Sequence, residues 1–166
     1  MIRVLVLNGP NLNLLGTREP EIYGHTTLGE IDEGLRRRGA ELGLAVESLQ
    51  SNHEGVLIDR LHRRDFDWVI VNAGGLTHTS VSLRDALLAV GRPFVEVHLS
   101  DPSRRESFRH VNYLHDIATE TIVGRGAAGY SDALDLIAGR TSDSGATGKP
   151  VDGTVRADAA EEPGAG

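Results

Sequence analysis

The chain has 166 residues, a length that predicts one domain with a sizeable core. Its formal net charge of −7 argues against nucleic acid as a partner, because binding to a phosphate backbone requires a basic face. The chain contains no cysteine, which excludes disulfides, a thiolate nucleophile and a cysteine-ligated metal. It also contains no apolar run of the length that an export signal or a membrane span requires, so we expect a protein of the reducing cytoplasm with no membrane partner.

The first part of the chain contains a short apolar strand, a loop and a helix. Residues 2–7 form an unbroken apolar run that ends in the turn sequence NGPN. Residues 12–24 contain glycines, a proline and charges, which predicts a loop that could act as a lid. Thr26 or Thr27 then caps a helix, and Glu30 suits a capping box with Thr27.

The middle of the chain repeats this order twice. Residues 44–49 predict a second strand, and residues 54–64 have the apolar stripe of an amphipathic surface helix. Residues 68–71, WVIV, predict a third strand that is buried on both faces of a parallel sheet. Ser80 or Ser82 then caps a helix that runs to Val90.

The last part predicts two more strands and a final helix. Residues 93–99 form a fourth strand that alternates, which places Glu96 and His98 on the same side. Residues 100–113 are polar and irregular, with one helical turn expected between 103 and 108. A fifth strand over 118–123 and a helix over 129–138 follow. We expect a domain over residues 1–140 and a disordered tail over 141–166, because that tail has too little apolar surface to offset the entropy of ordering.

Five alternating strands and helices indicate an α/β fold with a parallel sheet and right-handed crossovers. A doubly wound sheet of this size is most like flavodoxin, with strand order 2-1-3-4-5 and helices on both faces. Ligands bind such sheets at the carboxyl ends of the strands, in the crevice between strands one and three. The polar side chains expected at this rim are Asn8, Asn11, Asn72, His78, Glu96 and His98, with Arg18 and Tyr23 from the lid.

Several kinds of site can be set aside from motif spacing. The chain has no GxGxxG or GxxxxGK[ST] sequence for a nucleotide, no HExxH spacing for a metal and no GxSxG elbow for a serine nucleophile. The kind of site that remains possible is one in which tyrosine and histidine side chains carry out acid–base chemistry. The alternative from another class is a flavodoxin-like module that binds an anionic metabolite without turnover.

Four segments, LNGPNLNLLGTREPEIYG, NAGGLTHTSVSLRDA, EVHLS and SFRHVNY, resemble the type II 3-dehydroquinate dehydratase family in order and spacing. The resemblance covers about residues 2–139. It implies a lyase without cofactor or metal, which removes water from 3-dehydroquinate to give 3-dehydroshikimate by anti elimination through an enolate. That reaction belongs to the shikimate pathway and also to quinate breakdown.

The resemblance also implies roles for individual residues. Tyr23 would be the base, and Arg18 in the same lid would stabilise its phenolate, because a free phenol with a pKa of about 10 is a poor base at neutral pH. His98 would protonate the leaving hydroxyl, Glu96 would orient His98, and Asn11 would hold the enolate oxygen through a water.

The remaining implied contacts concern binding and assembly. The family pattern places substrate-binding groups at Asn72, His78, Leu99, Ser100, Arg109 and, for a neighbouring subunit's site, Asp85. Trimers that assemble into a homododecamer are therefore expected. The sequence departs from the family pattern at Asp101, Pro102 and Asn112, and we expect Asp101 and Pro102 to lower affinity or reposition their loop.

Overall fold

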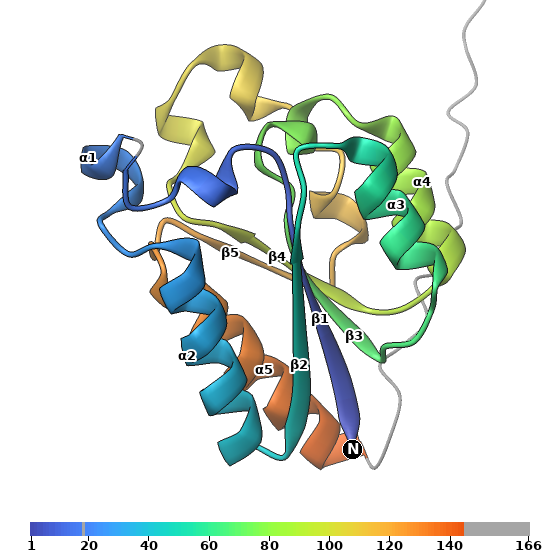
Figure 1. The fold of residues 1–166 in the computed structure, drawn as a ribbon. Coiled ribbons are helices and arrows are strands. Elements are labelled where there is room, and N and C mark those ends of the chain that lie inside the picture. The colour runs from blue at the N-terminus through green and yellow to red at the C-terminus, as the bar shows by residue number, and fades with distance from the viewer. Residues whose placement is uncertain (18, 145–166) are drawn as a thin grey trace, which may run out of the picture.

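The computed structural model describes residues 1–17 and 19–144, which form a five-stranded sheet between two layers of helices (Figure 1). The strands are β1 (Ile2–Asn8), β2 (Leu44–Gln50), β3 (Trp68–Asn72), β4 (Phe94–His98) and β5 (Glu120–Val123). They lie in the order β2-β1-β3-β4-β5, and every neighbouring pair is parallel. The predicted flavodoxin-like strand order is confirmed.

Helices cover both faces of the sheet, which explains why its central strands are apolar without interruption. Helices α2 (Leu28–Glu41) and α5 (Ala128–Ser144) pack on one face, and α3 (Glu54–His62) and α4 (Val81–Val90) pack on the other (Figure 1). Strand β1 shows the division: Val4 and Val6 enter the first core, whereas Leu5 and Leu7 enter the second. Complete burial of each such side chain contributes about 1.5–3 kcal/mol.

Local hydrogen bonds define where two helices begin. Thr27 Oγ1 accepts a bond from the Glu30 amide at 3.2 Å, and Glu30 Oε2 accepts one from the Thr27 amide at 2.8 Å. This is the predicted capping box, with Thr27 rather than Thr26 as the cap. At α4, Ser80 rather than Ser82 is the cap, because its Oγ accepts a bond from the Leu83 amide at 2.9 Å.

The predicted lid contains short helical elements that the sequence prediction missed. A 3₁₀ turn, η1 (Leu12–Leu14), follows β1, and a one-turn helix, α1 (Pro20–Tyr23), carries Tyr23. Proline at the first position suits a helix start, since that position needs no donor. Leu12 and Leu15 are buried in the core and attach the segment to the sheet. Arg18 lies outside the described residues.

The C-terminal half differs from prediction in two further places. The single turn expected after β4 is instead two 3₁₀ turns, η3 (Pro102–Arg104) and η4 (Ser107–His110), and a third, η5 (His115–Ile117), precedes β5. Helix α5 continues past the expected end at 138 and across the expected domain boundary at 140. The Thr141 hydroxyl donates to the Ile137 carbonyl at 3.0 Å, a contact that helical periodicity of apolar residues does not reveal. The expected tail from 145 onward lies outside the described residues.

The loops that follow β1 and β3 touch backbone to backbone. The Gly9 amide donates to the Asn72 carbonyl at 2.8 Å. A Cβ atom at Gly9 would lie 2.3 Å from the Ala73 carbonyl oxygen, far inside van der Waals contact, so only glycine fits. Among the described helices, none has the length and apolar character needed to cross a membrane.

Candidate active site

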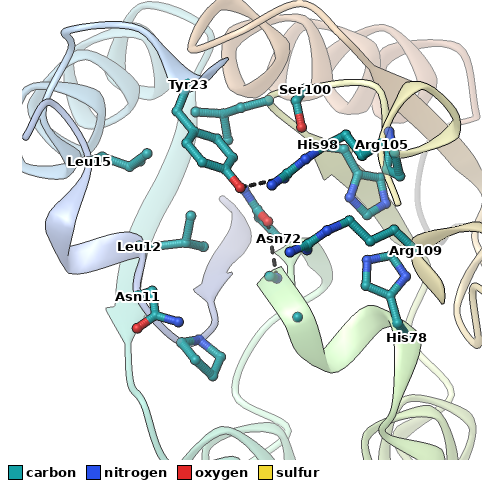
Figure 2. Close-up of a pocket in the computed structure, with 15 residues that line it drawn as sticks. Asn11, Leu12, Leu15, Tyr23, Asn72, His78, His98, Ser100, Arg105 and Arg109 are labelled. Carbon is teal, nitrogen blue, oxygen red and sulfur yellow. Dashed lines mark hydrogen bonds between the residues drawn. The ribbon is translucent and has the colours of Figure 1, made fainter. Parts of the chain in front are cut away.

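A pocket opens at the carboxyl ends of β1, β3 and β4, at the rim where the sequence predicted a site (Figure 2). Most of the predicted site residues line it: Asn11, Tyr23, Asn72, His78, His98, Leu99, Ser100 and Arg109. Glu96 lies fully buried beneath His98. Asp85 is exposed on α4 and does not line this pocket. Segments far apart in the chain therefore converge on one site.

His98 and Glu96 form a buried pair, as their alternation on one strand predicted. His98 Nε2 lies 2.5 Å from Glu96 Oε1, and His98 is only 7% exposed. The Glu96 carboxylate also accepts bonds from Asn112 Nδ2 at 2.6 Å and Thr121 Oγ1 at 3.2 Å. Burial raises the pKa of Glu96, but these three donors outweigh burial and hold the pKa below its ordinary value. Glu96 is thus a stable anion that engages Nε2 and leaves the other nitrogen of His98, Nδ1, for the pocket.

Asn112 has a structural role that the sequence did not reveal. Its Nδ2 donates to Glu96, while its Oδ1 accepts bonds from the amides of Leu114 at 2.8 Å and His115 at 3.0 Å. Both ends of the side-chain amide are therefore fixed. The residue that stood out as a departure from the family pattern supports the Glu96 carboxylate.

Tyr23 is paired with an arginine that the sequence reasoning missed. Arg105 Nη1 donates to the Tyr23 hydroxyl at 2.5 Å, and its guanidinium carbon lies 5.3 Å from the ring centroid (Figure 2). Arg105 lies between η3 and η4, and its side chain is 15% exposed. A fixed guanidinium beside a phenol stabilises the phenolate form. The prediction gave this task to Arg18, which lies outside the described residues, so that prediction stays untested. Among the described residues, Arg105 makes the contact.

The opposite wall presents Asn72, His78 and Arg109. His78 Nδ1 lies 2.6 Å from the Val111 carbonyl, which can only accept, so Nδ1 carries the proton. Burial lowers the pKa of His78 by more than the bond to Val111 raises it. The imidazole is therefore neutral at pH 7, and its Nε2 is an acceptor. Arg109 Nε donates to Glu106 Oε2 at 2.6 Å, which orients its guanidinium.

The Asp101 carboxylate does not line the pocket and instead builds a turn beside it. It accepts bonds from the Ser103 hydroxyl at 2.7 Å and the Ser103 amide at 3.0 Å, and these bonds lower its pKa. It caps η3, and Pro102 occupies the first position of that turn, where no amide proton is needed. The two departures from the family pattern thus build a turn, of which only Pro102 lines the pocket.

A hydrogen-bonded chain of three buried side chains runs from Asn72 to residues beneath the pocket. Asn72 Nδ2 donates to the Tyr130 hydroxyl at 2.9 Å, and that hydroxyl donates to Asn8 Oδ1 at 2.6 Å. Asn8 was expected at the rim, but it lies beneath the pocket without lining it. Tyr130 was expected only as a packing residue of the last helix.

Metal ligands do not gather in this region. Within residues 1–17 and 19–144, no three histidine, aspartate or glutamate side chains are grouped so that they could hold a metal ion. The polar side chains of the pocket are a phenol, two imidazoles, two amides, a serine hydroxyl and two guanidinium groups. Such a set can bind an organic anion and move protons to and from it.

Comparisons with known proteins give one consistent result. The sequence model described as "Dehydroquinase class II" matches residues 2–138. "Catabolic 3-dehydroquinase 2" from Aspergillus flavus is 56% identical over 136 residues, which cover 81% of this chain and 91% of that protein. "3-Dehydroquinate dehydratase" from Erwinia tasmaniensis is 55% identical over 143 residues, which cover 85% and 95%. The solved type II dehydroquinase from Propionibacterium acnes superposes with a TM-score of 0.79 at 39% identity and covers 84% of this chain and 97% of that one.

Proposed function

The chain belongs to the class II dehydroquinase family, as the sequence motifs indicated, and from that premise we propose how its pocket carries out the reaction. The protein is a 3-dehydroquinate dehydratase, a hydro-lyase that removes water from 3-dehydroquinate to give 3-dehydroshikimate in the shikimate pathway. One observation carries the mechanism: Tyr23 and His98 line the same pocket, the first beside a guanidinium and the second against a carboxylate.

Tyr23 is the base of the first step. Its phenolate takes a proton from the carbon next to the ketone, and the electron pair left behind forms an enolate. The Arg105 guanidinium, which contacts the Tyr23 hydroxyl, stabilises the phenolate before the step. Arg18, from the same segment, adds positive charge near the enolate, and Asn11 holds the enolate oxygen through a water.

His98 is the acid of the second step. As the enolate collapses, the bond from carbon to the departing hydroxyl breaks, and His98 donates the proton that makes this hydroxyl water. Glu96 stabilises the imidazolium through the 2.5 Å contact with Nε2, so Nδ1 is the nitrogen that donates. The elimination is anti, with the base and the acid on opposite faces of the substrate ring. It is redox-neutral, and we propose no cofactor.

The remaining pocket residues hold the substrate. The Asn72 side chain and the backbone amides of Leu99 and Ser100 donate to the carboxylate, and Arg109 supplies positive charge and donors for ring hydroxyls. Since the neutral His78 presents Nε2 as an acceptor, it suits a ring hydroxyl rather than the carboxylate. The motif resemblance implied that His78 donates to the carboxylate, and we propose this role in its place.

The protein acts in the cytoplasm as trimers, which assemble into a homododecamer. Asp85 is exposed on α4, where it can reach the pocket of a neighbouring subunit. Val81 on the same helix and Phe108 in η4 are 51% and 62% exposed, and such apolar surface suits contact between copies. Light scattering on the purified protein tests the assembly, and a monomer at all concentrations would contradict it.

The test of function is direct. The protein is incubated with 3-dehydroquinate, and the ultraviolet absorbance of the conjugated enone product is followed. We expect turnover by the unmodified chain, and loss of it in both Tyr23→Phe and His98→Ala. Tyr113→Phe is the matched control, because Tyr113 does not line the pocket. An unmodified, folded protein that gives no enone would refute the proposal.

A further inference from the structure

The side-chain amide of Asn72 has to face one way to bind an anion. Its two ends have nearly the same shape but opposite character, because Nδ2 donates and Oδ1 accepts. A flipped amide would present an oxygen lone pair to a carboxylate. Because shape does not choose between the two orientations, other contacts of Asn72 must decide which atom faces the ligand.

Three hydrogen bonds decide this orientation. The Gly74 amide donates to Asn72 Oδ1 at 3.3 Å, a bond that the NH₂ group of a flipped side chain could not accept. Nδ2 then faces the Tyr130 hydroxyl at 2.9 Å. That hydroxyl has a single proton, which it donates to Asn8 Oδ1 at 2.6 Å, so it presents only lone pairs to Asn72. One Nδ2 proton of Asn72 is used, and the second is free to bind a ligand.

The surroundings allow no easy replacement of these bonds. Asn8 and Tyr130 are 0% exposed, and Asn72 is 3% exposed. Burial also raises the pKa of Tyr130, so the hydroxyl keeps its proton throughout the neutral range. Asn8 and Asn72 are direct partners in the register of β1 and β3. Gly129 lets α5 approach the sheet closely, since a Cβ there would lie 3.3 Å from Val97 Cγ1.

We propose that Tyr130, with Asn8 behind it, is a positioning residue that holds the Asn72 amide with its N–H toward the substrate carboxylate. Neither Tyr130 nor Asn8 lines the pocket, so both act through Asn72. The inference rests on the proposed function, because that function supplies the anion that Asn72 binds. If the inference is correct, substitutions of Tyr130 or Asn8 change the affinity for substrate, although the substrate touches neither residue.

Two variants test the chain of bonds. Tyr130→Phe keeps the ring and removes the hydroxyl, so Asn72 loses the acceptor that selects Nδ2. We expect KM for 3-dehydroquinate to rise about tenfold while kcat changes less than about twofold, the pattern for lost ground-state binding. Asn8→Ala releases the Tyr130 proton to donate to Asn72 Oδ1, which favours the flipped amide, and it should raise KM similarly. The double variant should resemble each single variant, because all three break the same chain.

A matched control separates positioning from loss of stability. Ile137→Val shortens a fully buried side chain on the same helix and touches neither asparagine, so it should lower Tm and leave KM unchanged. Unchanged KM in a folded Tyr130→Phe or Asn8→Ala variant would overturn the inference, as would an equal rise in Ile137→Val. If Tyr130→Phe does not fold, Asn8→Ala decides. Absence of turnover in the unmodified protein would instead refute the proposed function.

Discussion

Replacing Arg105 with glutamine tests the contact that distinguishes this pocket from the one the sequence predicted. The substitution keeps a polar side chain, although a shorter one, and removes the positive charge beside the Tyr23 hydroxyl. Without that charge, proton transfer to and from the Tyr23 oxygen loses an electrostatic partner, and the first step becomes slower. We therefore expect a fall in kcat, with a smaller change in KM.

The size of the effect follows from the geometry. Two unit charges about 4 Å apart interact by about 4 kcal/mol at an effective dielectric constant near 20. The Arg105 side chain is 15% exposed, and Glu106 Oε2 lies 3.9 Å from its Nε, so solvent and a second anion both reduce this value. A net loss of about 2–3 kcal/mol remains, which corresponds to a roughly 30- to 150-fold fall in kcat.

The assay is the rate of enone formation at saturating 3-dehydroquinate. Arg104→Gln is the matched control, because Arg104 is its exposed neighbour in sequence and does not line the pocket. It should reduce kcat less than about threefold, as expected for an exposed charge that is screened by solvent. Thermal unfolding of both variants should match the unmodified protein closely. If Arg105→Gln kept kcat within about threefold, Tyr23 would not depend on this guanidinium, and the assignment would be wrong.

Four further variants test other parts of the proposal. Arg18→Ala should abolish turnover while a product-like carboxylic acid still binds, as measured by calorimetry; full turnover would contradict the role of this residue as a cation near the enolate. Glu96→Gln should lower kcat by about 100-fold, because an amide does not stabilise imidazolium. Because the pKa of Glu96 is lowered on folding, its carboxylate stabilises the fold above the unfolded pKa of about 4.3, and that stabilisation is lost as pH falls through the folded value. Tm measured from pH 6 to pH 3 should therefore fall less steeply in Glu96→Gln. Asp101→Ala should lower Tm and leave KM within about twofold, since the carboxylate caps η3, and a large fall in KM would show instead that its negative charge opposes binding of the anionic substrate. A chain that ends at Ser144 should keep full kcat, since the family match ends at residue 138.

Patterns between near neighbours in the sequence predicted most of the fold. Thr27 and Glu30 are three positions apart, and both partners of the capping box can be read from the sequence. The same is true of Glu96 and His98, which two-residue alternation places on one face of β4. The roles of these residues in catalysis came from motif resemblance, since spacing alone indicated only acid–base chemistry.

Contacts between distant segments were not predictable in this way. Arg105 and Tyr23 are 82 positions apart, and Arg105 is one of several arginines in a polar segment without periodicity. Tyr130 and Asn8 are 122 positions apart. The helical pattern predicted only that the ring of Tyr130 packs in the core, and not that its hydroxyl makes a hydrogen bond. Which arginine reaches the phenol, and which hydroxyl reaches the asparagine, depends on how the sheet brings its strand ends together. A hydrogen bond of this kind has no signature in local sequence.

The contact between Gly9 and Ala73 limits which substitutions this enzyme can accept during evolution. At the junction of the loops after β1 and β3, main chain meets main chain, and no side chain is available there to be trimmed or enlarged. A methyl group at position 9 would clash with the Ala73 backbone and push Asn11 and Asn72 apart. At the opposite margin, side chains of α1, η3 and η4 line the pocket, and substitutions there can reshape its mouth without disturbing this junction.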